Sequence, residues 1–415
     1  MDRLRELARD RAFIVGIGLA ALAGVVYWLS NKDYDAGHGD FFYLARSFGE
    51  GRVWLDAEAR SHVGPWDVLQ VGNRFYVPFA PFPAILFMPI AAIVDPVVLD
   101  QWESGINAAL AAGAIGLAWM LMGRIGVPRL RDRFWLVVLL GFSTQLWWVT
   151  TRGGVWHTGH IIATGLTLLA LIEVWGRQRP VVIGLLAGAA FLTRAPLAFA
   201  LPCYALMIER QWDPPVVRAA GAFVERLAAR WPIREWVVMG LAFGVGFAFF
   251  LWYNHARFGS ILESGYGLAA LPDFLQDQRD KGLFSLAHVP MNIDYFLLKV
   301  PRRIDEFPWF RPDTLGMSVL ITSPGLLLAL FAPWRNPRTW WLAGAAILVL
   351  IPTLLYYGGG WLQYGYRYFL DSIPFVLALC GMAVAASGRL SWTWVAVILF
   401  GVVVGLGGVY WAYNI

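Results

Sequence analysis

Three carboxylates and a histidine lie close together early in the chain, in the sequence Asp33-Tyr-Asp35-Ala-Gly-His38-Gly-Asp40. Side chains of these types can take up and release protons, and carboxylates can together hold a divalent cation. The group directly follows the first apolar stretch of the chain, so it would stand at a membrane–water boundary. Ionisable residues at such a place are candidates for a functional site. The alternative is an ordinary solvated loop that ends in a helix cap.

A helix is predicted to begin at Asp40, because Phe41, Leu44, Ala45 and Phe48 recur at the spacing of one helix face. The helix dipole and the free N–H groups of a first turn favour a carboxylate there. We expect this helix to lie with its apolar face on the membrane surface.

A second group of ionisable residues stands at the outer ends of the predicted membrane spans: Arg194, His160, Arg257, Arg367 and Asp371. A charge placed inside the hydrocarbon layer costs roughly a few kcal/mol, so such residues are rarely kept without a function. Because Arg367 and Asp371 are four residues apart, a purely structural ion pair explains these two equally well.

Arg194 precedes Pro196 at a predicted helix break, where its permanent charge needs an anion or a cluster of carbonyl oxygens. His157 and His160 have the HxxH spacing that also occurs in metal sites. No glutamate pattern accompanies them, so hydrogen bonding at the membrane interface is favoured over zinc binding.

The composition indicates an integral membrane protein. Hydrophobic residues make up 58% of the 415 residues, charged residues only 15%, and the mean hydropathy is +0.57. The 22 tryptophans are typical of side chains anchored at two membrane interfaces. Cys203 and Cys380 lie in apolar runs and indicate neither a disulfide framework nor a metal site. The pI near 9.2 is explained by the distribution of charge across the membrane, and no nucleic-acid partner is expected.

The hydropathy pattern predicts an all-α polytopic fold with about eleven membrane spans. The spans are expected at 12–30, 104–123, 134–151, 159–175, 181–209 (a V-shaped pair of short helices with Arg194 at its apex), 236–254, 315–333, 340–357, 368–386 and 392–412. The first is read as a retained anchor. The apolar segment Pro78–Val94 is too short and too rich in proline for a span, so a juxtamembrane or re-entrant helix is expected there.

No internal repeat or linker divides the chain, so 1–415 is expected to form one transmembrane domain. It would carry two large outer loops, 31–103 with juxtamembrane helices and 255–314. The segments assigned to the inside hold 18 basic and nine acidic residues, and the remaining residues hold 15 and 19. This split of +9 and −4 satisfies the positive-inside rule with a cytoplasmic N-terminus.

Several motifs resemble the C-type (GT-C) superfamily of polytopic glycosyltransferases. They are the Asp40-Phe-Phe-Tyr-Leu-Ala block, the proline-rich helix Pro78–Pro89, the hairpin that runs from Gly184 to Thr193-Arg194-Ala195-Pro196, and the segments Tyr253–Ser260 and Gly360–Asp371. Relatives in this superfamily include oligosaccharyltransferase catalytic subunits, protein O-mannosyltransferases and lipid A aminoarabinose transferases. The chain departs from the pattern at Phe41, where relatives often carry a second acidic residue, and no large soluble C-terminal domain is expected after the last span.

The resemblance implies an inverting transfer of a sugar from a polyprenyl-phosphate-linked donor to a glycan, lipid or protein acceptor. Asp40 would be the general base, with Asp35, Asp33 or His38 assisting. The phosphate would be bound by Arg194, Arg257 and Arg367, whose forked donors match its oxygens, and His160 and Tyr366 would make further contacts with it. A divalent cation such as Mg²⁺ or Mn²⁺, if present, would be held by Asp33, Asp35 and Asp40.

The resemblance also places the protein in the plasma membrane, in contact with lipid and with its active site on the outer, periplasmic face. Two other classes of protein fit the same charges. A transporter or flippase for lipids or small solutes would carry them at mid-membrane, in pseudo-symmetric halves that the sequence lacks. A non-catalytic subunit of a membrane complex would tolerate the loss of Asp40.

Overall fold

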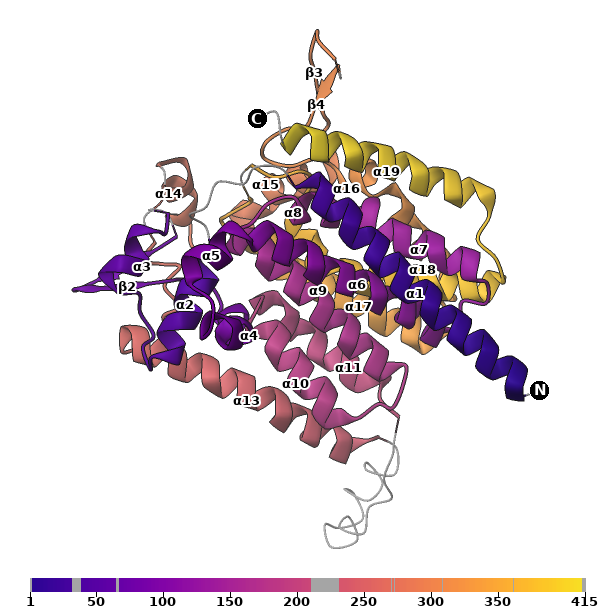
Figure 1. Ribbon diagram of the computed structural model, residues 1–415, viewed down its shortest axis with the longest axis horizontal. Coiled ribbons are helices and arrows are strands. Elements are labelled where there is room, and N and C mark those ends of the chain that lie inside the picture. The colour runs from indigo at the N-terminus through magenta and orange to yellow at the C-terminus, as the bar shows by residue number, and fades with distance from the viewer. Residues whose placement is uncertain are drawn as a thin grey trace, which may run out of the picture.

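The computed structural model describes residues 2–31, 39–64, 67–209, 231–269, 271, 273–307, 309–360 and 362–412. Six of its helices are long and apolar enough to cross a membrane. They are α1 (Asp2–Ser30), α6 (Glu103–Ile125), α9 (Val155–Val174), α13 (Ile233–Phe258), α17 (Pro337–Leu355) and α19 (Trp392–Ala412). These helices form most of the bundle in Figure 1, and the prediction of an all-α polytopic membrane protein is confirmed.

Shorter helical segments occupy the other predicted spans. They are α7 (Leu130–Phe142), α8 (Leu146–Thr150), α10 (Pro180–Phe191), η1 (Ala195–Ala200), α11 (Leu201–Met207), α16 (Val319–Thr322), η5 (Pro324–Phe331), η6 (Arg367–Asp371) and α18 (Ile373–Ser387). The number of segments that cross the membrane, about eleven, stays a prediction.

Two segments lie outside the long helices, and Figure 1 shows α2, α3, α5 and α14, which belong to them, on the left side of the bundle. The first contains α2 (Asp40–Gly49), α3 (Ala57–Ser61), the hairpin of β1 (Leu69–Val71) and β2 (Arg74–Tyr76), α4 (Phe82–Ala91) and α5 (Pro96–Gln101). The second contains α14 (Asp273–Arg279), η3 (Leu286–His288), α15 (Val289–Ile293), the π-helical turn η4 (Asp294–Leu298) and the hairpin of β3 (Arg302–Arg303) and β4 (Phe310–Arg311). With only 10 residues, α4 is too short to cross a membrane, as expected for Pro78–Val94.

Close packing between α10 and α13 fixes the segment that leads to Arg194. A Cβ atom on Gly184 would lie 2.3 Å from the carbonyl oxygen of Met239, and one on Gly246 would lie 3.1 Å from the backbone of Gly188. Small residues at such contacts let two membrane helices approach each other closely. Any larger side chain at Gly184 would therefore push the two helices apart.

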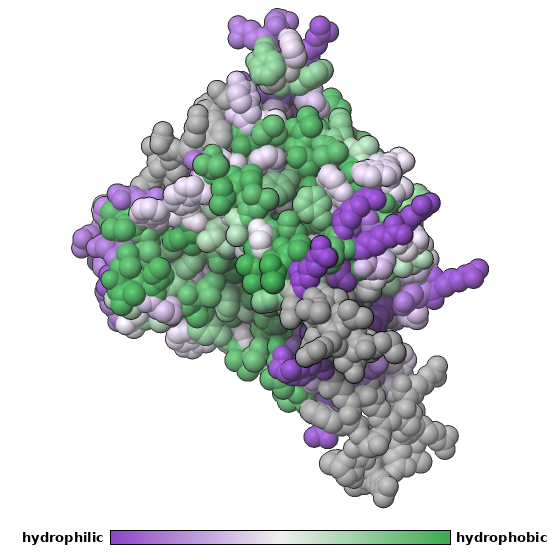
Figure 2. All heavy atoms as spheres, turned by 45° about the vertical axis from the view of Figure 1, so that its right-hand side comes forward, coloured by the Kyte–Doolittle hydropathy of each residue, from purple (hydrophilic) through white to green (hydrophobic). Residues whose placement is uncertain are grey.

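The outer surface of the bundle is apolar, as a lipid-facing surface requires. Figure 2 shows a broad apolar area between hydrophilic groups at the edges of the visible face. Large exposed side chains include Leu241 and Val245 on α13 and Val403 on α19. Only 11% of the most apolar part of α13 is buried within the protein, so this helix has most of its side chains available to lipid.

The helix that begins at Asp40 does not lie on the membrane surface, and this prediction is wrong. In α2, Phe41, Leu44 and Ala45 of the predicted apolar face are buried, and Phe42 on the other side is buried too. The Phe42 ring packs against Phe87 of α4 with 4.8 Å between ring centroids. The apolar face therefore faces protein, because α4 and the start of α9 cover it.

Candidate active site

Asp40 is the first residue of α2, as predicted, and its side chain is completely buried. Among the described residues, neither of its carboxylate oxygens accepts a hydrogen bond. Gly39 precedes it at the N-cap position and no side chain caps the helix. Asp40 is therefore neither a solvated loop residue nor a helix cap. A buried carboxyl group without a partner is costly, and such costs are typical of functional positions.

Three further carboxylates come close enough to Asp40 to act on its charge: Asp67 from the loop after α3, Asp100 from α5 and Glu103 at the start of α6. Burial raises the pKa of Asp40 well above its usual range, and the charges of Asp67, Glu103 and Asp100 raise it further, while Arg60 acts in the opposite direction. Burial also raises the pKa of Asp67 to about 7. Asp40 thus binds a proton more strongly than an ordinary carboxylate does, as a base must.

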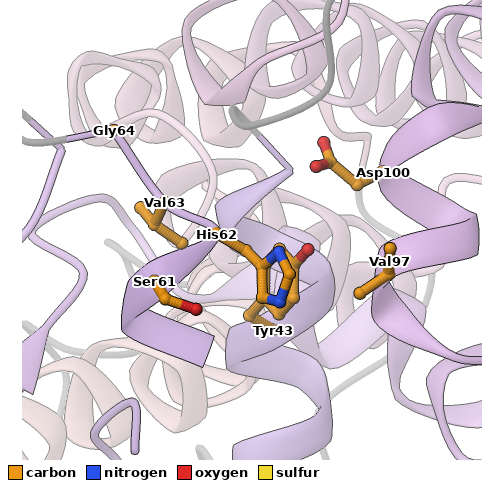
Figure 3. A pocket seen from close by; sticks show the side chains of 7 residues that line it. All are labelled: Tyr43, Ser61, His62, Val63, Gly64, Val97 and Asp100. Atoms are coloured by element: carbon orange, nitrogen blue, oxygen red, sulfur yellow. The ribbon is translucent and has the colours of Figure 1, made fainter. Parts of the chain in front are cut away.

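A close approach at Gly39 brings Asp100 to this group of carboxylates. A Cβ atom on Gly39 would lie 2.5 Å from the Asp100 carboxylate, so only glycine fits there. Asp100 also lines an open cavity of about 360 Å³. In Figure 3 the rings of Tyr43 and His62 overlie each other in this cavity, opposite Asp100 and Val97. Asp100 is thus the member of the carboxylate group that lines the cavity.

Arg194, His160 and Asp371 form a second cluster at the same end of the bundle. Arg194 lies in extended backbone between α10 and η1, at the break in the helical hairpin where it was expected. Its Nε donates to Asp371 Oδ2 at 3.0 Å. The same buried carboxylate lies 3.0 Å, through Oδ1, from Nδ1 of His160 on α9. Asp371 therefore pairs with residues of two other segments. The ion pair with Arg367 that the four-residue spacing suggested is not among the contacts of Asp371 within the described residues.

The second cluster contains two arginines on one aromatic ring. The guanidinium carbon of Arg194 lies 5.3 Å from the centroid of Tyr368, and that of Arg367 lies 5.5 Å from it. Asp371 holds Arg194 by its Nε alone, and within the described part of the chain Nη1 and Nη2 make no hydrogen bond. The Arg194 side chain is 21% exposed, so these two nitrogens can meet a ligand. The forked terminal nitrogens of a guanidinium group suit an anion with several oxygens, such as a phosphate.

The structure does not bring Arg257 or the Tyr366 hydroxyl into this cluster as ligand donors. The Arg257 Nη1 donates to the carbonyl oxygen of Val77 at 2.9 Å, and Nη2 donates to Asn254 Oδ1 at 2.9 Å. These bonds join the end of α13 to the first outer segment. The hydroxyl of Tyr366 is buried and donates to the carbonyl oxygen of Thr353 at 3.0 Å. A phosphate-binding role for either residue stays a prediction that these contacts do not favour.

The first turns of α9 connect the two clusters. Glu103 accepts hydrogen bonds from the backbone N–H of Gly154 at 2.6 Å and from the hydroxyl of Thr158 at 2.7 Å. Two residues later on the same helix, His160 contacts Asp371. The carboxylates around Asp40 and the arginines around Tyr368 therefore flank the start of one helix at one end of the bundle. No hydrogen bond within the described residues joins Asp40 to Arg194.

Asp33, Asp35 and His38, expected to assist Asp40, lie outside the described residues. Among the residues that the structure does describe, no three or more His, Cys, Asp or Glu side chains are placed to hold a metal ion. His157 forms a hydrogen-bonding contact between Nδ1 and the carbonyl oxygen of Gly153 at 2.7 Å. His157 thus makes a hydrogen bond, and the position of the HxxH segment at the membrane interface stays a prediction.

Sequence reasoning missed the carboxylates Asp67, Asp100 and Glu103, and the ring of Tyr368. Glu103 could have been found, because it is an acidic residue at the outer end of a predicted span, the signal that identified Asp371. Asp67 and Asp100 gave no such signal, since acidic residues in a polar loop are normally solvated. Tyr368 is one of 15 tyrosines and nothing in its spacing distinguishes it.

The comparisons with known proteins find no matching family model and no matching curated protein. Among solved structures, the chain is similar to ArnT from Cupriavidus metallidurans bound to undecaprenyl phosphate, at 16% identity and a TM-score of 0.47, over 91% of this chain and 60% of that one. It is also similar to the Archaeoglobus fulgidus oligosaccharyltransferase in the apo form, at 14% identity and a TM-score of 0.46, over 97% of this chain and 55% of that one. The chain thus spans less than two thirds of the length of either protein, and likeness at this level identifies no residue or reaction.

Proposed function

We propose that this chain is a membrane glycosyltransferase of the C-type superfamily. In this proposal it moves a sugar from a polyprenyl-phosphate-linked donor to an acceptor at the outer face of the cell membrane, with inversion at the anomeric carbon. The observation that carries the proposal is the arrangement of Arg194. Its Nε is held by the buried Asp371, its two terminal nitrogens are left for a ligand, and Arg367 lies on the same tyrosine ring.

The donor phosphate would bind to the terminal nitrogens of Arg194, with Arg367 beside it. Charge-assisted hydrogen bonds from guanidinium groups are the strong ones, and they orient a phosphate through two oxygens at once. Asp371 would act as a positioning residue, since it fixes the direction of the guanidinium plane without contacting the phosphate. The apolar surface of the bundle would accommodate the polyprenyl chain in the bilayer.

The transfer would proceed by a single displacement. Asp40 removes the proton from the acceptor hydroxyl, whose oxygen attacks the anomeric carbon of the sugar. The bond from that carbon to the phosphate oxygen breaks, and the electron pair leaves with the polyprenyl phosphate, whose negative charge the arginines stabilise. Because attack comes from the side opposite the leaving phosphate, the anomeric configuration inverts. The acceptor, a glycan, a lipid or a protein, would supply only the hydroxyl group.

A divalent cation, Mg²⁺ or Mn²⁺, is part of the proposal as an option. The two oxygens of Asp40, which accept no hydrogen bond within the described residues, fit a cation, but these residues do not supply enough ligands around them. Asp33 and Asp35, which lie outside the described residues, would have to complete the site. A bound cation would supply positive charge to stabilise the leaving phosphate.

Binding of undecaprenyl phosphate to the purified protein in lipid nanodiscs tests the proposal without knowledge of the sugar. We expect Arg194→Gln to weaken binding about 10- to 100-fold, because a hydrogen bond to a charged group contributes roughly 1.5–3 kcal/mol. Arg131→Gln is the matched control. Arg131 also lies on an aromatic ring, 3.9 Å from the centroid of Trp392, and next to Asp132, but it belongs to the first turn of α7, away from the cluster. Equal affinity of the two variants would contradict the proposal.

A further inference from the structure

The hairpin of β3 and β4 has no part in the proposed transfer, yet it is among the most exposed elements of the protein. It projects from the bundle near the C-terminal end of α19, at the top of Figure 1. Arg302 pairs with Arg311 across the two strands, and Arg303 pairs with Phe310. The ion pair between Arg302 and Asp313, at 2.7 Å, fixes the base of the hairpin.

Three large aromatic side chains at the end of this hairpin are exposed: Phe307 at 69%, and Trp309 and Phe310 at 58% each. The rings of Phe307 and Trp309 meet edge to face, with 5.2 Å between their centroids. Trp309 has a positive φ of 65°, an uncommon conformation for a bulky residue, which is kept where the position of the side chain matters. Exposed aromatic clusters of this kind mark a surface that contacts something else.

The charges of the hairpin do not suit an oppositely charged protein partner. Arg303 and Arg311 are exposed, but Asp305 and Glu306 are exposed beside them, so the two signs balance. The arrangement of aromatic rings with arginines instead suits a membrane–water interface, where rings lie at headgroup level and charged groups reach water or phosphate.

The hairpin also lies where such an interface is expected. The Phe307 ring packs against Tyr410, with 6.4 Å between centroids. Tyr410 is 45% exposed and belongs to the last turn of α19, a helix long and apolar enough to span the membrane. The aromatic end of the hairpin is therefore at the level where a membrane span ends.

We propose that the β3–β4 hairpin lies in the lipid headgroup region beside the end of α19, with Phe307 and Trp309 inserted toward the acyl chains. Its partner is the bilayer itself, and the contact would hold this side of the protein at a fixed depth. The inference does not depend on the proposed transferase activity, only on α19 crossing the membrane.

Site-specific fluorescence quenching tests this contact. The full protein with Trp309→Cys, or with Phe310→Cys as a second variant, is labelled with an environment-sensitive dye and placed in nanodiscs that contain nitroxide-labelled lipid. Asn73→Cys is the control, because it lies in the exposed turn of the other hairpin, β1–β2. The native Cys203 and Cys380 are buried and should not react. We expect quenching several-fold stronger at the β3–β4 positions than at position 73. Equal quenching at all three positions, whether strong or absent, would overturn the proposal. Absence of quenching at all three positions would favour a protein partner for the hairpin.

Discussion

Replacement of Asp40 by asparagine separates the proposed catalytic role from every structural one. The amide has nearly the shape of the carboxyl group but cannot accept a proton. Loss of a positioned general base typically lowers the rate about 10²–10⁴-fold, which corresponds to about 3–5 kcal/mol of transition-state stabilisation. We therefore expect turnover to fall at least about a hundredfold, with the donor still bound.

The effect of the same substitution on stability follows from the surroundings of Asp40. Its oxygens accept no hydrogen bond within the described residues, and burial together with three neighbouring carboxylates raises its pKa. The charged form is therefore unfavourable in the folded state, and a neutral amide should leave the free energy of unfolding unchanged or increase it. A decrease of several kcal/mol in that free energy would refute this description of the site.

The assay is single-turnover transfer together with thermal melting on the same protein samples. Asp95→Asn is the matched control, because Asp95 lies in the same outer segment and is a true helix cap, accepting from the N–H of Val97 at 2.8 Å. We expect that variant to keep its activity. A fully active Asp40→Asn enzyme would refute the role of Asp40 and transfer it to Asp35.

Three other outcomes are expected. Turnover should keep rising as the pH is raised well above 4, near which ordinary carboxyl groups titrate, because Asp40 must lose its proton before it can act as a base. A rate that is already constant at pH 5 would contradict this. Asp371→Asn should lower the free energy of unfolding by about 3–5 kcal/mol in thermal or denaturant unfolding, since it leaves the charge of Arg194 uncompensated; an unchanged value would show that the pair is not formed. Cysteine at the exposed Ser61 should react with an impermeant maleimide in intact cells, and cysteine at Ser391 only after lysis; the reverse pattern would invert the topology.

The arrangement of membrane helices could be predicted from the sequence because lipid imposes a simple rule on composition. A span needs about 20 consecutive apolar residues, whatever its neighbours are. The six long helices therefore lie where spans were expected, and proline at 196 correctly indicated the break at Arg194. Three other predicted spans, 134–151, 315–333 and 368–386, are divided into shorter segments. The two short hairpins β1–β2 and β3–β4 were not foreseen, since strands of two or three residues have no detectable alternation.

The contacts of the candidate site could be predicted only in part, because they join residues far apart in the chain. Asp371 pairs with Arg194, 177 residues away, whereas the sequence alone suggests the neighbour at helical spacing. Arg257 was expected at the phosphate because it is charged and close to a span end. Its actual partners, among them the Val77 carbonyl 180 residues away, become visible only once the first outer segment is folded onto α13.

The apolar face of α2 illustrates a further limit of sequence patterns. The spacing of Phe41, Leu44 and Ala45 correctly predicts a helix. An apolar stripe is the same whether lipid or protein covers it, so the pattern does not distinguish the two environments. In the folded chain α4 covers the stripe, and Asp40 at the start of the same helix is buried as well. The burial that raises the pKa of Asp40 is thus a tertiary property.

A structure of the protein in nanodiscs with undecaprenyl phosphate bound tests the central claim most directly. We expect a phosphate group within hydrogen-bonding distance of the two terminal nitrogens of Arg194, at the end of the bundle that holds Asp40. A phosphate bound elsewhere, with Arg194 still joined only to Asp371 and Tyr368, would contradict it.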